Sequence, residues 1–171
     1  MLSDKLVKMI DENAERLTTR WIEDVKTNTS TPGYHQYSSA ELHDKVYDVF
    51  KRLSHWMKGD ISKNEIAMYY TRLGRTRYHE KFHLGEVIFA TILAKRYLIQ
   101  FIDEQGLYDD SLRMNTLLEF HDRINFFFDK VIFFMTIGFE NAHVIEEMFY
   151  AQNGFFDKTV DAFTGWILRR G

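Results

Sequence analysis

Helical periodicity is the feature of this sequence that most restricts its fold. Apolar residues recur every three or four positions along most of the 171 residues, and no segment alternates apolar and polar residues as a half-buried strand does. Only one proline is present, Pro32, and it lies in a loop-like segment, residues 27–37. The pattern therefore predicts an all-α chain.

Three helices are expected in the first half of the chain, each with one apolar stripe. The first covers residues 4–26. The next two follow capping boxes, in which a serine and a glutamate three residues later satisfy each other's backbone N–H groups. These boxes are Ser38 to Glu41 and Ser62 to Glu65.

Two longer helices, about 84–104 and 111–139, differ from the first three because they are apolar over most of their circumference. Such a helix must be buried on more than one side. We therefore expect a homodimer in which these helices of two copies form a four-helix bundle. A monomer with two central helices is the alternative. The expected interface residues are Phe89, Leu93, Phe126, Phe133 and Phe134.

Composition limits the class of protein. The formal net charge of −3 argues against a general nucleic-acid binder, and the lack of cysteine excludes a disulfide framework. The N-terminus lacks a signal-peptide core, and the apolar stretch 124–139 is too short and too charged to span a membrane. We expect a cytoplasmic protein with a domain at 1–140 and a helical extension or linker at 141–171.

One motif suggests metal chemistry. His79-Glu80-Lys81-Phe82-His83 matches H-E-x-x-H, in which a helix presents two imidazoles to zinc and the glutamate activates water. Glu104 is the candidate third ligand. A zinc-dependent hydrolase is therefore one alternative function. However, Leu84 and Gly85 look like the start of the next helix, so we expect His79 and His83 to lie on a turn and to bind no metal.

Other catalytic arrangements find less support. Two E-x-x-H triplets, Glu80 to His83 and Glu140 to His143, have the spacing of di-iron bundles, but both lie near helix ends and no inward-facing glutamate completes a site. No Ser-His-Asp arrangement or phosphate-binding glycine loop is present. We therefore expect that the protein is not an enzyme.

The run Leu73-Gly74-Arg75-Thr76-Arg77, followed by the helix start at Leu84, resembles the stretch of bacterial globin-coupled sensors that carries the haem-binding histidine. Arg77 occupies the position of that histidine, and a guanidinium cannot ligate iron. Over residues 5–140 the chain therefore resembles the RsbR-type non-haem globin sensors. The resemblance implies a globin-like fold, no haem, and a role in stress-response signalling rather than catalysis.

The same resemblance implies a ligand site at Arg77, with Tyr70, Tyr78 and Arg75 around it. Arg77 would hold a carboxylate or an inorganic anion, and a fatty acid could occupy the vacated pocket. Alternatively, these arginines pair with acidic residues of neighbouring helices. The implied partner is a downstream regulatory protein or output domain. A haem-based gas sensor using His79, His83 or His121 is the remaining alternative.

Overall fold

The computed structural model describes residues 2–105 and 111–151, with side chains for 4–105 and 114–147. Within these ranges the chain is all-α and contains no strand, as the periodicity predicts. The elements are α1 (Leu2–Glu12), α2 (Ala14–Val25), the short 3₁₀ helix η1 (Pro32–Tyr34), α3 (Ser39–Lys58), α4 (Lys63–His79), α5 (Leu84–Asp103) and α6 (Ser111–Ala151).

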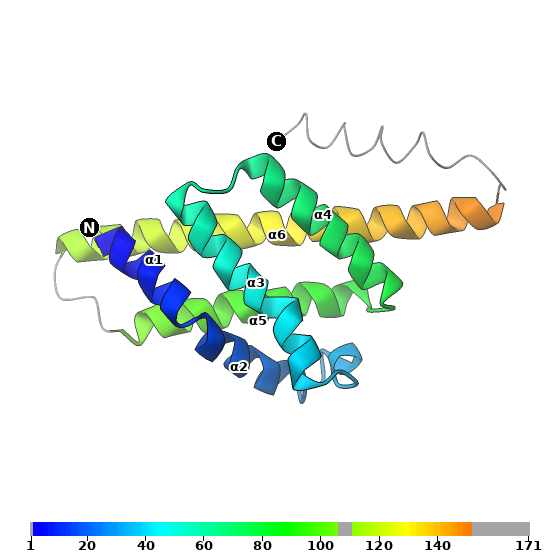
Figure 1. Cartoon of the computed structure of the whole chain (residues 1–171), viewed down its shortest axis with the longest axis horizontal. Helices are drawn as coiled ribbons and strands as arrows, with labels where there is room; N and C mark the ends of the chain where they lie inside the picture. The colour runs from blue at the N-terminus through cyan, green and yellow to red at the C-terminus, as the bar shows by residue number, and fades with distance from the viewer. Residues whose placement is uncertain (1, 106–110, 152–171) are drawn as a thin grey trace.

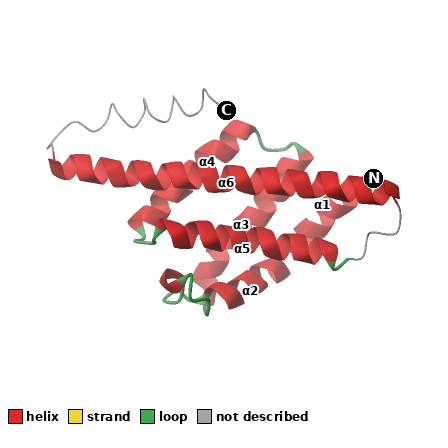
Figure 2. Ribbon diagram, turned by 180° about the vertical axis from the view of Figure 1, so that it is seen from behind, coloured by secondary structure: helices red, strands yellow, loops and turns green. Residues whose placement is uncertain are grey.

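The helices form two layers. Helices α5 and α6 run side by side along the long axis, and α1, α3 and α4 cross them on one side (Figures 1 and 2). The core between the layers is rich in aromatic side chains. Its largest fully buried members are Tyr70, Phe50, Phe101, Phe120, Phe127 and Phe128.

Local sequence signals account for the ends of α3 and α4. The Ser38 hydroxyl accepts a hydrogen bond from the Glu41 backbone N–H at 3.3 Å, and the Glu41 carboxylate accepts one from the Ser38 backbone N–H at 2.8 Å. Ser62 and Glu65 form the second predicted box. Gly59 ends α3 with a φ of 84°, a left-handed conformation that glycine adopts without steric cost.

The expected helix over residues 4–26 is two helices, because the helix breaks at Asn13. The Asn13 side-chain amide donates to the Met9 carbonyl at 2.8 Å, and the backbone there leaves the helical region with a φ of −109°. An asparagine that bonds to its own backbone competes with helix continuation.

The last helix is longer than expected, because α6 passes Phe139 and continues to Ala151. No proline or glycine follows Gly138 within the helix, so nothing in residues 139–151 ends it. The division of the chain at residue 140 stays a prediction, and most of the extension, residues 152–171, lies outside the described part.

Two glycines allow α4 and α6 to cross in backbone contact. A Cβ added at Gly74 would overlap the carbonyl oxygen of Met135, and one added at Gly138 would overlap the carbonyl oxygen of Thr71. Each helix therefore needs a residue without a side chain at the crossing point. This contact fixes α6 against the end of α4 that leads into the α4–α5 turn.

Over the described residues, no helix combines the length and the hydropathy that crossing a bilayer requires.

Candidate functional site

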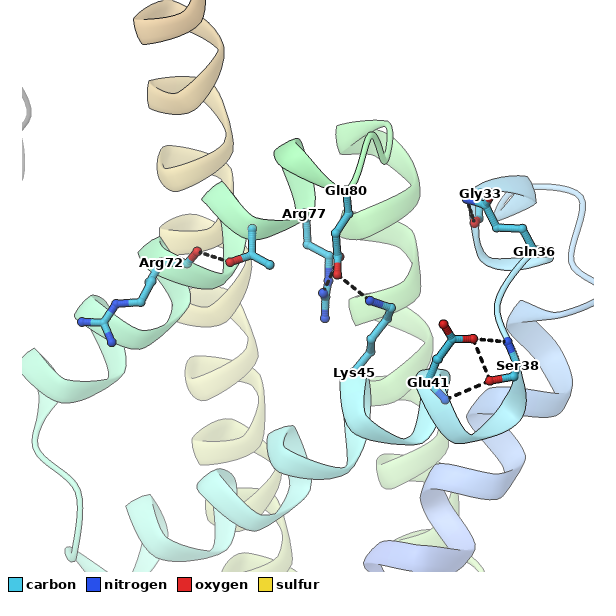
Figure 3. A network of polar contacts seen from close by, with 9 residues as sticks. Gly33, Gln36, Ser38, Glu41, Lys45, Arg72, Arg77 and Glu80 are labelled. Atoms are coloured by element: carbon cyan, nitrogen blue, oxygen red, sulfur yellow. Dashed lines mark hydrogen bonds and ion pairs between the residues drawn. The ribbon is translucent and has the colours of Figure 1, made fainter. Parts of the chain in front are cut away.

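The α4–α5 turn, residues 80–83, brings three charged side chains together. Arg77 lies in the last turn of α4 and is buried, with 6% of its surface exposed. Its Nη1 donates to Glu80 Oε2 at 2.7 Å, and Lys45 Nζ on α3 donates to Glu80 Oε1 at 2.7 Å (Figure 3). One carboxylate thus joins two cations, and the cluster carries a net positive charge.

Burial and charge oppose each other at Glu80. Burial raises the pKa of Glu80, but the hydrogen bond from Lys45 and the charge of Arg77 outweigh it, so the net pKa lies below the ordinary value. Glu80 is therefore a carboxylate at neutral pH.

Aromatic rings cover this charged cluster. Phe82, in the turn, stacks on Tyr37 with ring centroids 5.4 Å apart and tilts against Tyr34 at 4.5 Å. Lys45 Nζ lies 4.6 Å from the centre of the Tyr37 ring. Such cation–π contacts are stronger where water is excluded. The rings therefore hold the turn against the loop before α3.

A buried acid, Glu86, fixes the start of α5 to that same loop. Glu86 is 8% exposed, and its Oε2 accepts a hydrogen bond from the Gly33 backbone N–H at 2.9 Å. A Cβ at Gly33 would overlap this carboxylate, so glycine leaves the space that the acid occupies.

A small cavity of about 30 Å³ lies between the cluster and the core. Arg77, Lys45 and Tyr34 line its polar side, and Trp21 and mostly apolar residues of α3, α4, α5 and α6 line the remainder. The volume suits a water molecule or a small ion. It is too small for a haem or for the fatty acid that the resemblance implied.

Of the four predicted ligand residues, only Arg77 lies at this cluster. Tyr70 is in the core, edge-on to Phe127, and its buried hydroxyl has no hydrogen-bond partner in the described part. Tyr78 points to α6, where its hydroxyl donates to the Glu146 carboxylate. Arg75 is half-buried elsewhere on α4. The four side chains do not form one site.

The H-E-x-x-H motif lies on a turn, as expected. His79 is the last residue of α4, and His83 precedes the first residue of α5. Between them Lys81 has a φ of 65°, so no helix aligns the two imidazoles. The zinc-site interpretation also lacks its third ligand. Glu104 lies at the opposite end of α5 from His83, and at 1.5 Å per residue the helix separates the two by roughly 30 Å.

The remaining metal and haem candidates are dispersed. Glu140 and His143 are exposed on α6, and His121 lies 3.4 Å from the Asp103 carboxylate. In the described ranges, no group of three or more His, Cys, Asp or Glu side chains could hold a metal ion.

The five expected interface residues divide between core and surface. Leu93 and Phe134 are buried in the core of a single chain, and Phe89 is partly buried. Phe126 and Phe133 are exposed, by 48% and 57%. One chain therefore already covers Leu93 and Phe134 and part of Phe89, whereas Phe126 and Phe133 are free to meet a partner.

Sequence reasoning did not find Lys45 and Glu86. Each acts on a residue distant in sequence, Glu80 in one case and Gly33 in the other. The acidic residue in the first turn of α5 was the only local signal, and it is equally typical of an ordinary helix start.

Comparison with known proteins identifies the family. A family model described as "Histidine kinase N terminal" matches residues 3–141. The crystal structure of the sporulation inhibitor pXO2-61 from Bacillus anthracis is similar in fold, with a TM-score of 0.63 and 20% identity, covering 80% of this chain and 96% of that chain. No curated protein shows significant sequence similarity.

This match corrects the resemblance to RsbR-type sensors, which is wrong. The histidine kinase N-terminal family covers the whole stretch that carried the resemblance, including residues 73–77. The interpretation of Arg77 as a replaced haem ligand is lost with it. The structure instead shows Arg77 as the buried partner of Glu80.

Proposed function

This chain belongs to the histidine kinase N-terminal family, and we propose that it is a non-catalytic signal-sensing domain that regulates a downstream kinase or regulatory protein. The observation that carries the proposal is the connection between the charged turn and α6. Tyr78, one residue after Arg77, bonds across to Glu146 near the far end of α6. A change at the turn would therefore move the helix that leads out of the domain.

The shape of α6 supports this route. Helix α6 is 41 residues long and crosses α4 where Gly74 of α4 and Gly138 of α6 let the backbones meet. The last turns of α6 extend beyond α4 (Figure 1). The hydrogen bond from Tyr78 lowers the pKa of Glu146, so the carboxylate stays charged and bonded at neutral pH. Lys81 in the turn adds a weaker contact, 3.9 Å from Glu146 Oε1.

The proposed mechanism is a shift between two packing arrangements. A ligand or partner that binds the two arrangements unequally changes their populations. We propose that two copies associate through α5 and α6 as a four-helix bundle, so that the shift becomes a relative movement of protomers. The globin-like description of the helices stays a prediction.

The test is a fusion of the full chain to the catalytic core of a histidine kinase that lacks its own sensor. Autophosphorylation is measured for the wild type and for Tyr78→Phe, which keeps the ring and removes the bond to Glu146. We expect the rates to differ several-fold. Tyr47→Phe, on α3, is the matched control and should match the wild type. Equal rates for the core alone and for all fusions would exclude the proposed role.

A second candidate is a domain that acts on a kinase as a separate molecule, in trans. It is supported by the similarity to the sporulation inhibitor chain, because the shared fold makes up 96% of that chain. The same kinase fusion distinguishes the two, because free chain added to it would reduce autophosphorylation only if the domain acts in trans.

A further inference from the structure

The outer face of α6 carries an exposed apolar stripe. Figure 2 shows α6 on the viewer's side of the molecule, with α3 and α4 passing behind it. On this face Phe126, Phe133 and Val144 are 48%, 57% and 50% exposed, and Ile137 is half-buried. Phe126 and Phe133 are seven residues apart, as are Ile137 and Val144. A seven-residue repeat keeps a stripe facing one partner helix.

Two charged residues complete the repeat. Lys130 and Glu140 occupy the stripe on either side of Phe133 and Ile137. Lys130 Nζ lies 4.7 Å from the centre of the Phe126 ring, which places it on the same face. Within the described chain neither Lys130 nor Glu140 makes a hydrogen bond or an ion pair. Each charge is thus free to meet one on another molecule.

The order of these residues distinguishes parallel from antiparallel pairing of two copies. In a parallel, in-register pair Lys130 would face the other Lys130 and Glu140 the other Glu140, and like charges at an interface are costly. In an antiparallel pair centred at the level of Met135, Lys130 faces Glu140. The same register places Phe133 against Ile137 and Phe126 against Val144. Each apolar residue therefore meets an apolar residue, and each charge meets the opposite charge.

We propose that two copies of this chain pair through α6 in antiparallel orientation, about a two-fold axis at the level of Met135. The interface is isologous, so the Lys130–Glu140 pair and both apolar layers occur twice. The proposal rests on the dimer of the proposed function and adds its register.

Disulfide cross-linking tests the orientation, because the chain contains no cysteine and gives no background. In the proposed register the two copies of residue 144 lie about 27 Å apart along the helix, and so do the two copies of residue 126. A disulfide requires Cα atoms within about 7 Å. Neither Phe126→Cys nor Val144→Cys alone should therefore cross-link, whereas an equal mixture of the two should give a covalent dimer.

Charge reversal tests the Lys130–Glu140 pair by sedimentation equilibrium. Lys130→Glu and Glu140→Lys should each weaken dimer formation about tenfold in Kd, and the double variant should return to within about threefold of wild type. Glu23→Lys, an exposed charge on α2, is the control and should leave Kd unchanged. Only a direct pair predicts this rescue.

The outcomes separate the register from the dimer itself. A dimer whose single cysteine variants cross-link is parallel and overturns the register alone. The register is also overturned if the protein is a dimer but the mixture of the two cysteine variants does not cross-link, or if the Lys130→Glu/Glu140→Lys double variant does not recover dimer formation. A wild-type monomer at micromolar concentration overturns both the register and the dimer of the proposed function.

Discussion

At the scale of single residues, Glu80 shows how one carboxylate can hold two helices and a turn. We expect Glu80→Gln to lower the free energy of unfolding by about 1–3 kcal/mol at pH 7, because Arg77 and Lys45 lose their shared anion. The pKa of Glu80 is lowered in the folded state, so its stabilisation is complete above its unfolded pKa of about 4.5 and is lost as the pH falls through the folded value.

Urea unfolding at pH 7 and at pH 3 measures this effect. The difference between wild type and Glu80→Gln should shrink at the lower pH. Glu12→Gln, at an exposed position on α1, is the control and should change little at either pH. An undiminished difference at pH 3 would contradict the role of the charge.

Tyr70 is the opposite case, a buried hydroxyl without a partner in the described part. Replacing it with phenylalanine removes an unsatisfied group and keeps the ring, so we expect Tyr70→Phe to leave stability unchanged or raise it by up to about 1 kcal/mol. Tyr97→Phe is the comparison, because its hydroxyl donates to Asp24, and it should lose about 1 kcal/mol. Thermal unfolding of both variants measures the difference, and a marked loss for Tyr70→Phe would reveal a partner for that hydroxyl.

At the scale of elements, the crossing of α4 and α6 depends on two glycines. Gly74→Ala and Gly138→Ala should each destabilise the protein by about 3 kcal/mol or more, since the added methyl group meets backbone rather than a flexible side chain. Gly85→Ala in α5 is a matched control, because its Cβ would meet nothing, and helix propensity predicts a gain of up to about 1 kcal/mol. Similar melting temperatures for all three variants would show that the helices are not in contact.

The turn that ends α4 carries the H-E-x-x-H residues. His79→Ala and His83→Ala should keep stability and bind no less zinc than wild type, since both side chains are exposed and no helix aligns them. Elemental analysis after dialysis measures the bound metal. If wild type binds one zinc per chain and either substitution removes it, these histidines are metal ligands after all.

At the scale of the whole molecule, Phe133→Glu should convert a dimer to a monomer or cause aggregation. The substitution would bury a carboxylate at the proposed interface, which costs far more than leaving it in water. Met68→Glu, at a similarly exposed apolar position on α4, should leave the oligomeric state unchanged. Sedimentation velocity distinguishes the two, and an equal effect of both would indicate general instability rather than a lost interface.

The sequence by itself determined those features that depend on neighbouring residues. The helical spacing, the capping boxes at Ser38 and Ser62 and the end of α3 at Gly59 are all set by groups within a few residues of each other, so their patterns can be read directly. The position of His79 to His83 on a turn could also be predicted, because the start of α5 is visible at Leu84.

The tertiary structure alone decided which distant residues meet. Lys45 and Glu80 are 35 residues apart, and no local pattern joins them. Gly138 and Thr71 are also distant in the sequence, and only the crossing of α4 and α6 shows that Gly138 leaves room for the Thr71 backbone. The motif at residues 73–77 was too short to identify a family. The contacts that its residues make depend on α6, which crosses α4 at Gly74. Local spacing thus sets the elements, and side-chain packing between elements sets the site.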